Sequence, residues 1–306
     1  MKRIHTTLFA LIASFYVLTA QTAFQASHSN ASLENKQQAG GEDFDKKWRF
    51  GLRFTPQFTW FSSKEKNLES QGSVFGYGFG LHLEYRFSET VGLITGIGGD
   101  FEGGKYNVKY DTANGYAVRY WLNNEGDFQQ PENGKAVTDY RKQGFTEYVL
   151  NERTIKTSYI TIPAILKMST KELSGFRYSG MFGGEIGIRL NTQAEDTYHE
   201  SYTFDANGQS VKNNIGSQAE INMADDTPLI PMRLGMNLGL GAEYRLSGNT
   251  SFMLSVNYFH SFINVLKPTS EYMVSSIQAN GSVNNYTFVK QAMVMRAVRI
   301  NLGILF

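Results

Sequence analysis

From Trp48 onward, large apolar side chains recur at every second position of the chain. In the stretch WRFGLRFTPQFTW, which begins at Trp48, aromatic and aliphatic side chains occupy one face, and arginine, glycine, threonine and glutamine occupy the other. A period of two is typical of β-strands whose two faces meet different surroundings. We identify eight such segments, at 48–61, 74–87, 91–110, 155–168, 176–191, 230–246, 251–265 and 291–306.

The connections between these segments alternate in length. Short turns follow the second, fourth and sixth segments, whereas the loops 62–73, 111–154, 192–229 and 266–290 are long. Short turns at one end, long loops at the other and an even number of strands are the layout of an outer-membrane barrel. The sequence therefore predicts an all-β fold: an eight-stranded antiparallel up-and-down transmembrane β-barrel with long extracellular hairpin loops.

The chemistry of the two faces supports a membrane barrel over a soluble one. One face is rich in aromatics, and the other combines glycine with charge, which suits lipid outside and a polar lumen inside. A lipocalin-like barrel or a β-sandwich is the alternative, but it would bury Glu84, Arg86, Glu243 and Arg245 in a dry core at a high cost in free energy.

The N-terminal region has the pattern of a targeting segment. Lys2 and Arg3 precede a short apolar stretch, and small residues follow it, so residues 1–26 are predicted to be a signal peptide. A membrane anchor is the alternative. Residues 27–47 are polar and unpatterned and are expected to form a flexible periplasmic leader. The barrel is predicted to occupy 48–306.

Composition narrows the possible functions. The 306 residues include no cysteine, which excludes disulfides, thiol catalysis and cysteine-bound metals. The formal net charge of +1 lacks the strongly basic footprint of a nucleic-acid-binding protein. We therefore expect no nucleic-acid partner.

A set of charged residues occupies the alternate strand positions that are predicted to point into the barrel. Eight strands enclose a lumen that side chains can fill. We predict that opposite charges form an ion-paired plug there, and a proton or ion path is the alternative. The predicted lumen charge network consists of Arg49, Arg53, Glu84, Arg86, Lys167, Arg177, Glu185, Arg189, Glu243, Arg245 and Arg299.

Candidate catalytic chemistry is sparse. Beyond the leader, His82, His199 and His260 fall on three distant segments, and no Gly-x-Ser-x-Gly, His-Glu-x-x-His or phosphate-loop motif occurs. The 192–229 loop is acidic and could hold a divalent cation, but we favour a solvated acidic loop. We predict a non-enzyme with no catalytic residues, no cofactor and no metal site.

The long loops carry two further signals. Asn-Gly pairs at 114–115, 133–134, 207–208 and 280–281 suit type I′ turns, so the strands are expected to continue as hairpins above the membrane. Aromatic residues such as Tyr120, Trp121, Tyr198 and Tyr272 also lie in these loops. They either form a surface that binds a glycan or protein or pack across the hairpins, and we favour packing.

Two prolines fall within predicted strands. Pro56 and Pro163 each lack the N–H that a sheet ladder needs, and a closed barrel has no free edge. We therefore expect β-bulges at these positions, or positions near a rim.

The stretch SYITIPAILKMS resembles a strand of the PorT-like outer-membrane β-barrel proteins of Bacteroidota. The matching residues are Tyr159, Ile162, Pro163 and Lys167, and the glycine-rich strands and aromatic terminus fit the same family. The resemblance implies an eight-stranded barrel in the outer membrane of a Gram-negative bacterium. Some relatives serve protein secretion, and the family pattern implies no catalytic residues.

The final segment, RINLGILF, places Ile300, Leu302, Ile304 and Phe306 on the lipid face. It is expected to pair with the first strand and to act as a signal for the barrel assembly machinery. We predict a non-enzymatic integral outer-membrane protein with a structural, surface-interaction or protein-secretion accessory role. The expected partners are outer-membrane lipid and a secretion-complex or surface partner. The second partner would bind through residues 111–154 and 192–229. A narrow small-solute or ion channel is the first alternative, and a rim-site enzyme is the second.

Overall fold

The computed structural model describes residues 47–306, apart from 112, 132–140, 214–216, 223–229 and 277–286. The predicted signal peptide and the predicted leader up to residue 46 lie outside the described residues. The described residues form strands joined by turns and loops. These strands are β1 (Trp48–Ser63), β2 (Leu68–Ser70), β3 (Val74–Arg86), β4 (Val91–Thr95), β5 (Gly98–Val108), β6 (Ala117–Asn123), β7 (Phe145–Ser169), β8 (Phe176–Phe204), β9 (Ser210–Asn213), β10 (Ser217–Asn222), β11 (Met232–Ser247), β12 (Thr250–Asn264), β13 (Thr269–Ser276), β14 (Thr287–Lys290) and β15 (Met293–Leu305).

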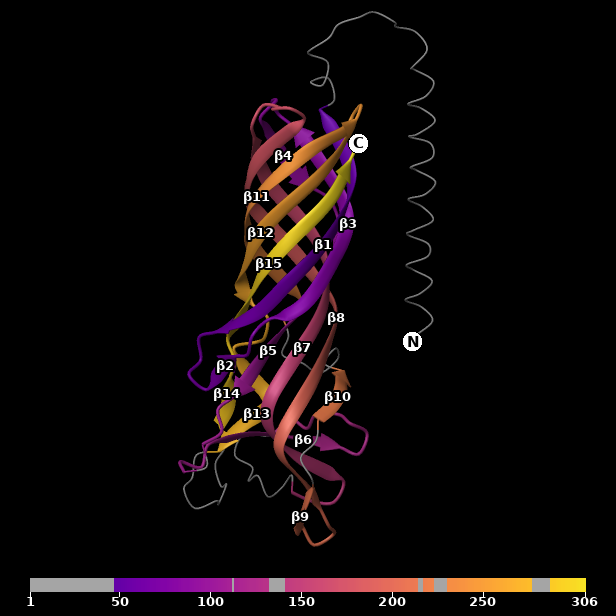
Figure 1. Cartoon of the computed structure of the whole chain (residues 1–306). Coiled ribbons are helices and arrows are strands. Elements are labelled where there is room, and N and C mark those ends of the chain that lie inside the picture. The colour runs from indigo at the N-terminus through magenta and orange to yellow at the C-terminus, as the bar shows by residue number, and fades with distance from the viewer. Residues whose placement is uncertain (1–46, 112, 132–140, 214–216, 223–229, 277–286) are drawn as a thin grey trace, which may run out of the picture. The chain divides into compact units, whose positions relative to one another are not determined.

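The strands close into an antiparallel ring (Figure 1). The order around the ring is β1, β3, β4 with β5, β7, β8, β11, β12 and β15, and β15 then pairs with β1. At this closure Leu52 faces Ile304 and Phe58 faces Val298. The prediction of an all-β antiparallel barrel is confirmed. The third segment is divided between β4 and β5, and β2, β6, β9, β10, β13 and β14 lie outside the ring.

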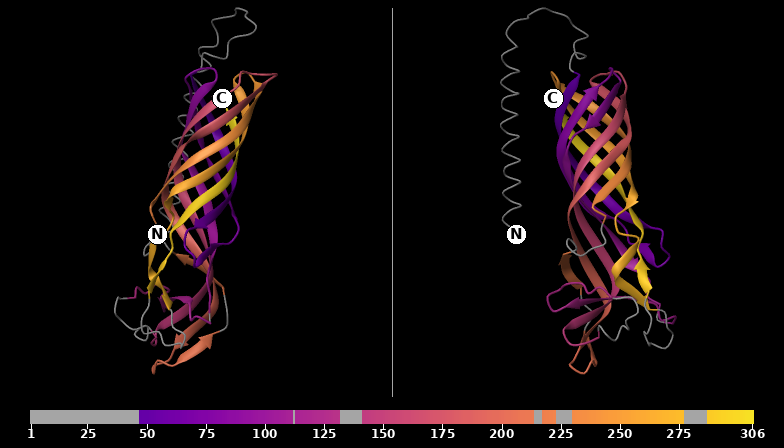
Figure 2. Two further views of the ribbon diagram at one scale, coloured as in Figure 1. Left: turned by 90° about the vertical axis from the view of Figure 1, so that its left-hand side faces the viewer. Right: turned by 180° about the vertical axis from the view of Figure 1, so that it is seen from behind.

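Strands β7 and β8 run far beyond the ring. They contain 25 and 29 residues, whereas a strand needs about 9–11 residues to cross a bilayer. The short turns and the C-terminus lie at one end of the barrel, and β6, β9, β10 and β13 lie at the other (Figures 1 and 2). We call this second end, built from the far halves of β7 and β8 with the strands around them, the extension. Wherever they are described, the predicted loop 192–229 is therefore largely strand, and about half of the predicted loop 111–154 is strand.

Burial reverses between the ring and the extension. In the ring, Phe50, Leu52 and Phe75 point outward with exposed fractions near 60%, whereas polar residues such as Gln57 are buried inside. In the extension the buried side chains are mostly apolar and form one large cluster around residues such as Tyr106. The ring is thus built for an apolar surrounding, and the extension is built for water.

The two strand prolines do not cause bulges. Strand β1 keeps the same register with β15 on both sides of Pro56, and β7 keeps its register with β8 through Pro163. On its other side, β7 changes partner from β5 at Thr161 to β4 at Ile165. The missing N–H of Pro163 falls at this change, so no bulge is needed. The predicted bulges are wrong at both positions.

The Asn-Gly turns also differ from the prediction. Gly115 and Gly208 have positive φ angles of 66° and 75°, but Ser174 is the only non-glycine in the described chain with a positive φ. A type I′ turn needs positive φ at both central residues, so this turn type is wrong at both sites. At 207–208 the Asp205 carboxylate instead accepts N–H bonds from Asn207 and Gln209, which stabilises a wider turn. The pairs at 133–134 and 280–281 lie outside the described residues.

Candidate functional site

The first tier of lumen charges lies near the short-turn end. Lys167 donates to the carboxylates of both Glu84, at 3.0 Å, and Glu243. Arg49 Nη1 lies 2.9 Å from Glu243 and 3.6 Å from Glu84, and its Nη2 donates to Ser251 at 2.9 Å. These four charged side chains are almost completely buried, and they come from β1, β3, β7 and β11. The tier therefore crosses the lumen with two cations and two anions.

A second tier lies closer to the extension. Arg299 contacts Glu185 at 2.8 Å and Glu102 at 3.4 Å. Arg233 donates to the same two carboxylates and lies 3.6 Å from Asp100. All five side chains are buried. Two arginines thus meet three acidic residues across the barrel interior.

The second tier contains residues that the sequence analysis missed. Asp100 and Glu102 occupy the alternate positions of β5 that face the barrel interior. Arg233 lies on the same face of β11 as Glu243. Strand parity alone could have identified all three.

Some predicted network residues lie outside the two tiers. Arg177 and Arg245 pair with Glu172 in the turn 170–175, at the mouth of the lumen. Arg86 contacts Glu84 at 3.4 Å on the margin of the first tier. Two further members are only partly buried: Arg53 lies beside Gly98, and Arg189 faces Tyr159 in the register of β7 with β8.

Glycines make room for these charges inside a narrow barrel. A Cβ built on Gly78 would overlap the carboxylate of Asp100, and one built on Gly187 would lie 3.2 Å from Nε of Arg233. Real Cβ contacts are rarely so close, so the alternation of glycine with charge has a steric reason.

The four residues that carry the PorT-like resemblance have different environments. Ile162 faces outward, and Lys167 belongs to the first tier. Tyr159 is buried with its ring 4.7 Å from the guanidinium of Arg233. Pro163 sits where β7 changes partner, as described above.

The extension is closed by an apolar core around one buried ion pair. Arg153 donates to Asp196 through Nε at 2.7 Å and Nη2 at 2.6 Å, and the hydroxyl of Tyr120 donates to Asp196 at 2.6 Å. Burial, followed by the charge of Asp196, raises the pKa of Tyr120 well above its ordinary value. Asp196 is therefore not solvated, which corrects the prediction for this part of the acidic loop. The preferred interpretation of the loop aromatics as packing residues is confirmed for Tyr120, Trp121, Tyr198 and Tyr272, which are all buried.

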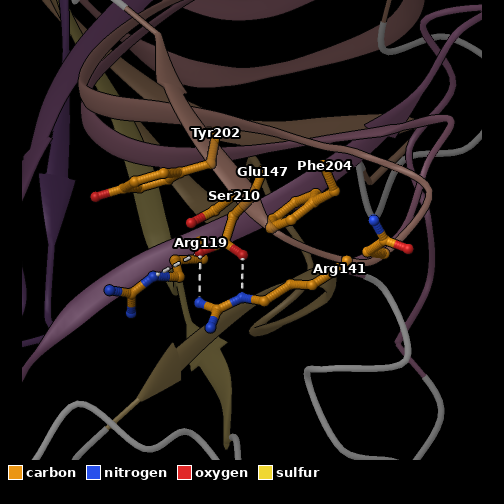
Figure 3. Close-up of a pocket in the computed structure, with 8 residues that line it drawn as sticks. Arg119, Arg141, Glu147, Tyr202, Phe204 and Ser210 are labelled. Carbon is orange, nitrogen blue, oxygen red and sulfur yellow. Dashed lines mark hydrogen bonds and ion pairs between the residues drawn. The ribbon is translucent and has the colours of Figure 1, made fainter.

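A cleft of about 590 Å³ opens in the extension beside β6, β7 and β8 (Figure 3). Within it, the carboxylate of Glu147 lies between the guanidinium groups of Arg119 and Arg141. Burial lowers the pKa of Arg141, but the hydrogen bond to Glu147 and the negative charge of Glu147 together outweigh this effect and leave the pKa above its ordinary value. Burial and the hydrogen bond to Glu200 raise the pKa of Tyr202, on the same cleft, to about 12. Arg141 therefore stays charged and Tyr202 stays neutral at physiological pH.

The three histidines do not form a common site. His82 is buried in the lumen 4.0 Å from Glu84, His199 stacks on Tyr110, and His260 lies beside the ring of Tyr258. Within the described ranges, no group of three or more histidine, aspartate or glutamate side chains is arranged to hold a metal ion. No helix among the described residues is both long and apolar enough to span a membrane.

Comparison with known proteins identifies the family. The chain matches the family described as outer membrane protein beta-barrel domain over residues 24–267. The chain belongs to this family. No curated protein matches it. The family places the protein in the outer membrane of a Gram-negative bacterium, as the sequence predicted.

Solved structures with a similar fold are also outer-membrane proteins. OprG from Pseudomonas aeruginosa is 14% identical, with 86% of this chain and 98% of that chain covered and a TM-score of 0.40. Neisserial surface protein A is 11% identical, with 85% and 96% covered and a TM-score of 0.33. The outer membrane protease OmpT from Escherichia coli is 10% identical, with 86% and 97% covered and a TM-score of 0.27. At such low identity these likenesses concern the fold alone, and the narrower PorT-like resemblance stays a prediction.

Proposed function

We propose that this family member is a non-enzymatic, non-conducting barrel that anchors a surface-interaction module in the outer membrane. The ring spans the bilayer, and the extension stands outside the cell. A secretion partner would be one form of such an interaction. The assembly role of Ile300, Leu302, Ile304 and Phe306 stays a prediction, although the first three do lie on the outward-facing positions of β15 and Phe306, which follows the strand, is exposed.

The observation that carries this proposal is the filling of the barrel interior. A conducting pore needs a continuous water path, but the charged residues of both tiers pair across the lumen and are at most 5% exposed. Beyond the second tier, the Arg153–Asp196 pair and the apolar cluster fill the extension. Eight-stranded barrels enclose little more space than side chains occupy, so no second passage is available inside the ring.

The histidine positions support the non-enzymatic part of the proposal. His82, His199 and His260 lie on separate parts of the chain, and each contacts a different set of residues. A general base must lie within hydrogen-bond reach of the group that it activates. None of the three is placed with the others to share such a role.

Planar-bilayer recording tests the closed lumen. The purified full chain, refolded in detergent and shown to be folded by heat-modifiable gel migration, should insert without steady single-channel steps. A general porin inserted in the same bilayers serves as the positive control. Reproducible unitary steps that scale with the folded protein and disappear after heat denaturation would overturn the proposal and favour the channel.

A further inference from the structure

The outward face of β15 carries a single charged residue, Arg296, at the end of an apolar band. The outward positions between it and the C-terminus are Val298, Ile300, Leu302 and Ile304. At about 3.3 Å per residue and a strand tilt of about 40°, the chain from Phe306 back to Arg296 rises about 25 Å, which is the height of the apolar band of a membrane barrel. Because the C-terminus lies at the short-turn end, Arg296 lies where the lipid-facing surface meets the extension.

Aromatic side chains flank Arg296 on both neighbouring strands. In the register of the sheet Arg296 faces Trp60 of β1 and His260 of β12, and these three strands lie side by side in the ring (Figure 1). The rings of Trp60 and Tyr258 lie 6.5 Å apart between centroids, across β15, and those of Tyr258 and His260 lie 6.4 Å apart. Tryptophan and tyrosine are enriched at membrane–water interfaces. Both the height and the aromatic flank therefore place Arg296 at the level of the lipid headgroups.

Arg296 has no counter-ion in the described part of the chain. Its Nε is buried without a hydrogen-bond partner, and the residue forms no ion pair there. Strands β1, β12 and β15 contain no aspartate or glutamate. The acidic residues of the adjoining strands β3 and β11 are Glu84 and Glu243, which belong to the first tier inside the lumen. The strands around Arg296 therefore supply no outward-facing carboxylate.

The adjoining loops do not neutralise this arginine either. Residues 64–73, after β1, contain two lysines and two glutamates, so their charges cancel. After β12, Lys267 pairs with Glu271 at 2.6 Å. Residues 291–292, before β15, are uncharged. Because the side chain of Arg296 is partly exposed, this surface carries a positive charge that an anion can reach.

Outward lysines near the same boundary on other strands do have acidic partners. Lys105 of β5 pairs with Glu152 at 3.0 Å, and Lys156 of β7 pairs with Glu195 at 2.8 Å. The boundary is therefore ion-paired at β5 and β7 but not at β15. A cation beside a membrane surface attracts anionic headgroups, and the planar donor array of arginine matches the oxygens of a phosphate.

We propose that Arg296 binds the phosphate group of a lipid in the outer leaflet, with Trp60 and Tyr258 packed against the same lipid. This inference rests on the part of the proposed function that seats the ring in the bilayer with the extension outside, and it adds a lipid site that the surface-interaction role does not include. Free phosphate has the same oxygens, but it has no apolar part for the aromatic flank to contact. The site is therefore assigned to a lipid.

Native mass spectrometry of the folded full chain, released from detergent micelles, tests the site. The probes are dilauroyl phosphatidic acid, the uncharged dilauroylglycerol and inorganic phosphate. Because hydrogen bonds to charged groups contribute about 1.5–3 kcal/mol, we expect phosphatidic acid to bind about tenfold or more tightly than dilauroylglycerol. An equal concentration of inorganic phosphate should not displace it. Equal binding of the two lipids would overturn the proposal, and displacement by inorganic phosphate would overturn the assignment to a lipid.

Variants separate the site from general surface charge. Arg296→Gln should weaken phosphatidic acid binding about tenfold, and Arg296→Lys should weaken it less, because lysine keeps the charge without the planar donor array. Lys156→Gln is the matched control, since it removes the same charge near the same boundary from a residue that already has a partner, and it should leave binding unchanged. Heat-modifiable migration shows that each variant is folded, as expected for Arg296→Gln because no ion pair within the described chain is lost.

Two results would refute the site. The first is wild-type binding of phosphatidic acid by Arg296→Gln, and the second is equal weakening by Arg296→Gln and Lys156→Gln, which would show that only the total charge matters. Planar-bilayer recording of the wild-type chain judges the closed lumen independently, so the lipid site and the proposed function can fail separately.

Discussion

Lys167 is the residue whose replacement most directly tests whether the lumen is a dry plug. It is 2% exposed and bridges the carboxylates of Glu84 and Glu243 across the barrel. In Lys167→Met the side chain keeps much of its length but loses its charge. Arg49, with Arg86 at the margin beside Glu84, then remains near the two buried carboxylates.

The size of the effect follows from the geometry of the tier. Lys167 and Glu84 lie 3.0 Å apart, and at an effective dielectric constant of about 20 two unit charges at that distance attract by about 5.5 kcal/mol before desolvation is counted. Removing one partner of a buried ion pair typically costs about 3–5 kcal/mol, because the remaining charge stays desolvated. We expect Lys167→Met to lose about that much free energy of unfolding.

The double variant Lys167→Met/Glu84→Gln provides the matched control. It leaves Arg49 and Glu243 as a pair 2.9 Å apart, so the charge in the tier balances again. We expect it to recover most of the stability that the single variant loses, to within about 1–2 kcal/mol of wild type. Urea unfolding of the refolded protein, followed by tryptophan fluorescence and heat-modifiable migration, measures all three proteins. A loss below about 1 kcal/mol for the single variant, or no recovery in the double variant, would show that water screens the tier and would refute the dry plug.

Two further predictions concern the extension. Asp196→Asn should lower the stability of the extension by about 3–5 kcal/mol, because Arg153 would stay buried without a counter-ion. The control Glu195→Gln changes the exposed neighbouring position and should cost less than about 1 kcal/mol. Hydrogen exchange of the extension measures both losses of stability, and equal losses for the two variants would contradict this reasoning. The second prediction concerns alkaline pH, since burial, followed by the charge of Asp196, raises the pKa of Tyr120 and of Tyr198 above the ordinary value of about 10. Above that pH the unfolded chain releases protons that the folded extension retains, so the stability present below pH 10 should decrease as the pH rises further. The ultraviolet absorbance of tyrosinate from these residues should then rise together with unfolding. Titration of Tyr120 and Tyr198 near pH 10 while the extension stays folded would contradict this prediction.

The sequence predicted the ring well because its strands have two unlike faces. The alternation around Leu52 and Phe75 identified which side chains point outward, and the lengths of the connections identified the up-and-down order. Those features are local, so they can be recognised without knowing which strands meet. Parity also placed Lys167, Glu84 and Glu243 inside the barrel.

Contacts across the lumen could not be predicted in the same way. Lys167 meets Glu84 and Glu243 from strands that are 83 and 76 residues away, and none of these strands are ring neighbours of one another. Which inward residues share a level depends on the strand tilt and the stagger of the closed ring. The same dependence explains why Arg177 and Arg245 lie at the mouth beside Glu172. The residues of the cleft in the extension likewise meet only when β6, β7 and β8 are in register.

The sequence by itself determined that this chain forms amphipathic β-strands and which residues share each face. The tertiary structure decided what each face means. Along β7 the inward positions run from apolar Ile155 in the extension to Lys167 in the ring, with no change of period. Alternation looks the same whether the apolar face packs inward against a core or outward against lipid. Only closure of the ring, and the extension of two of its strands beyond it, distinguishes the two environments along one strand.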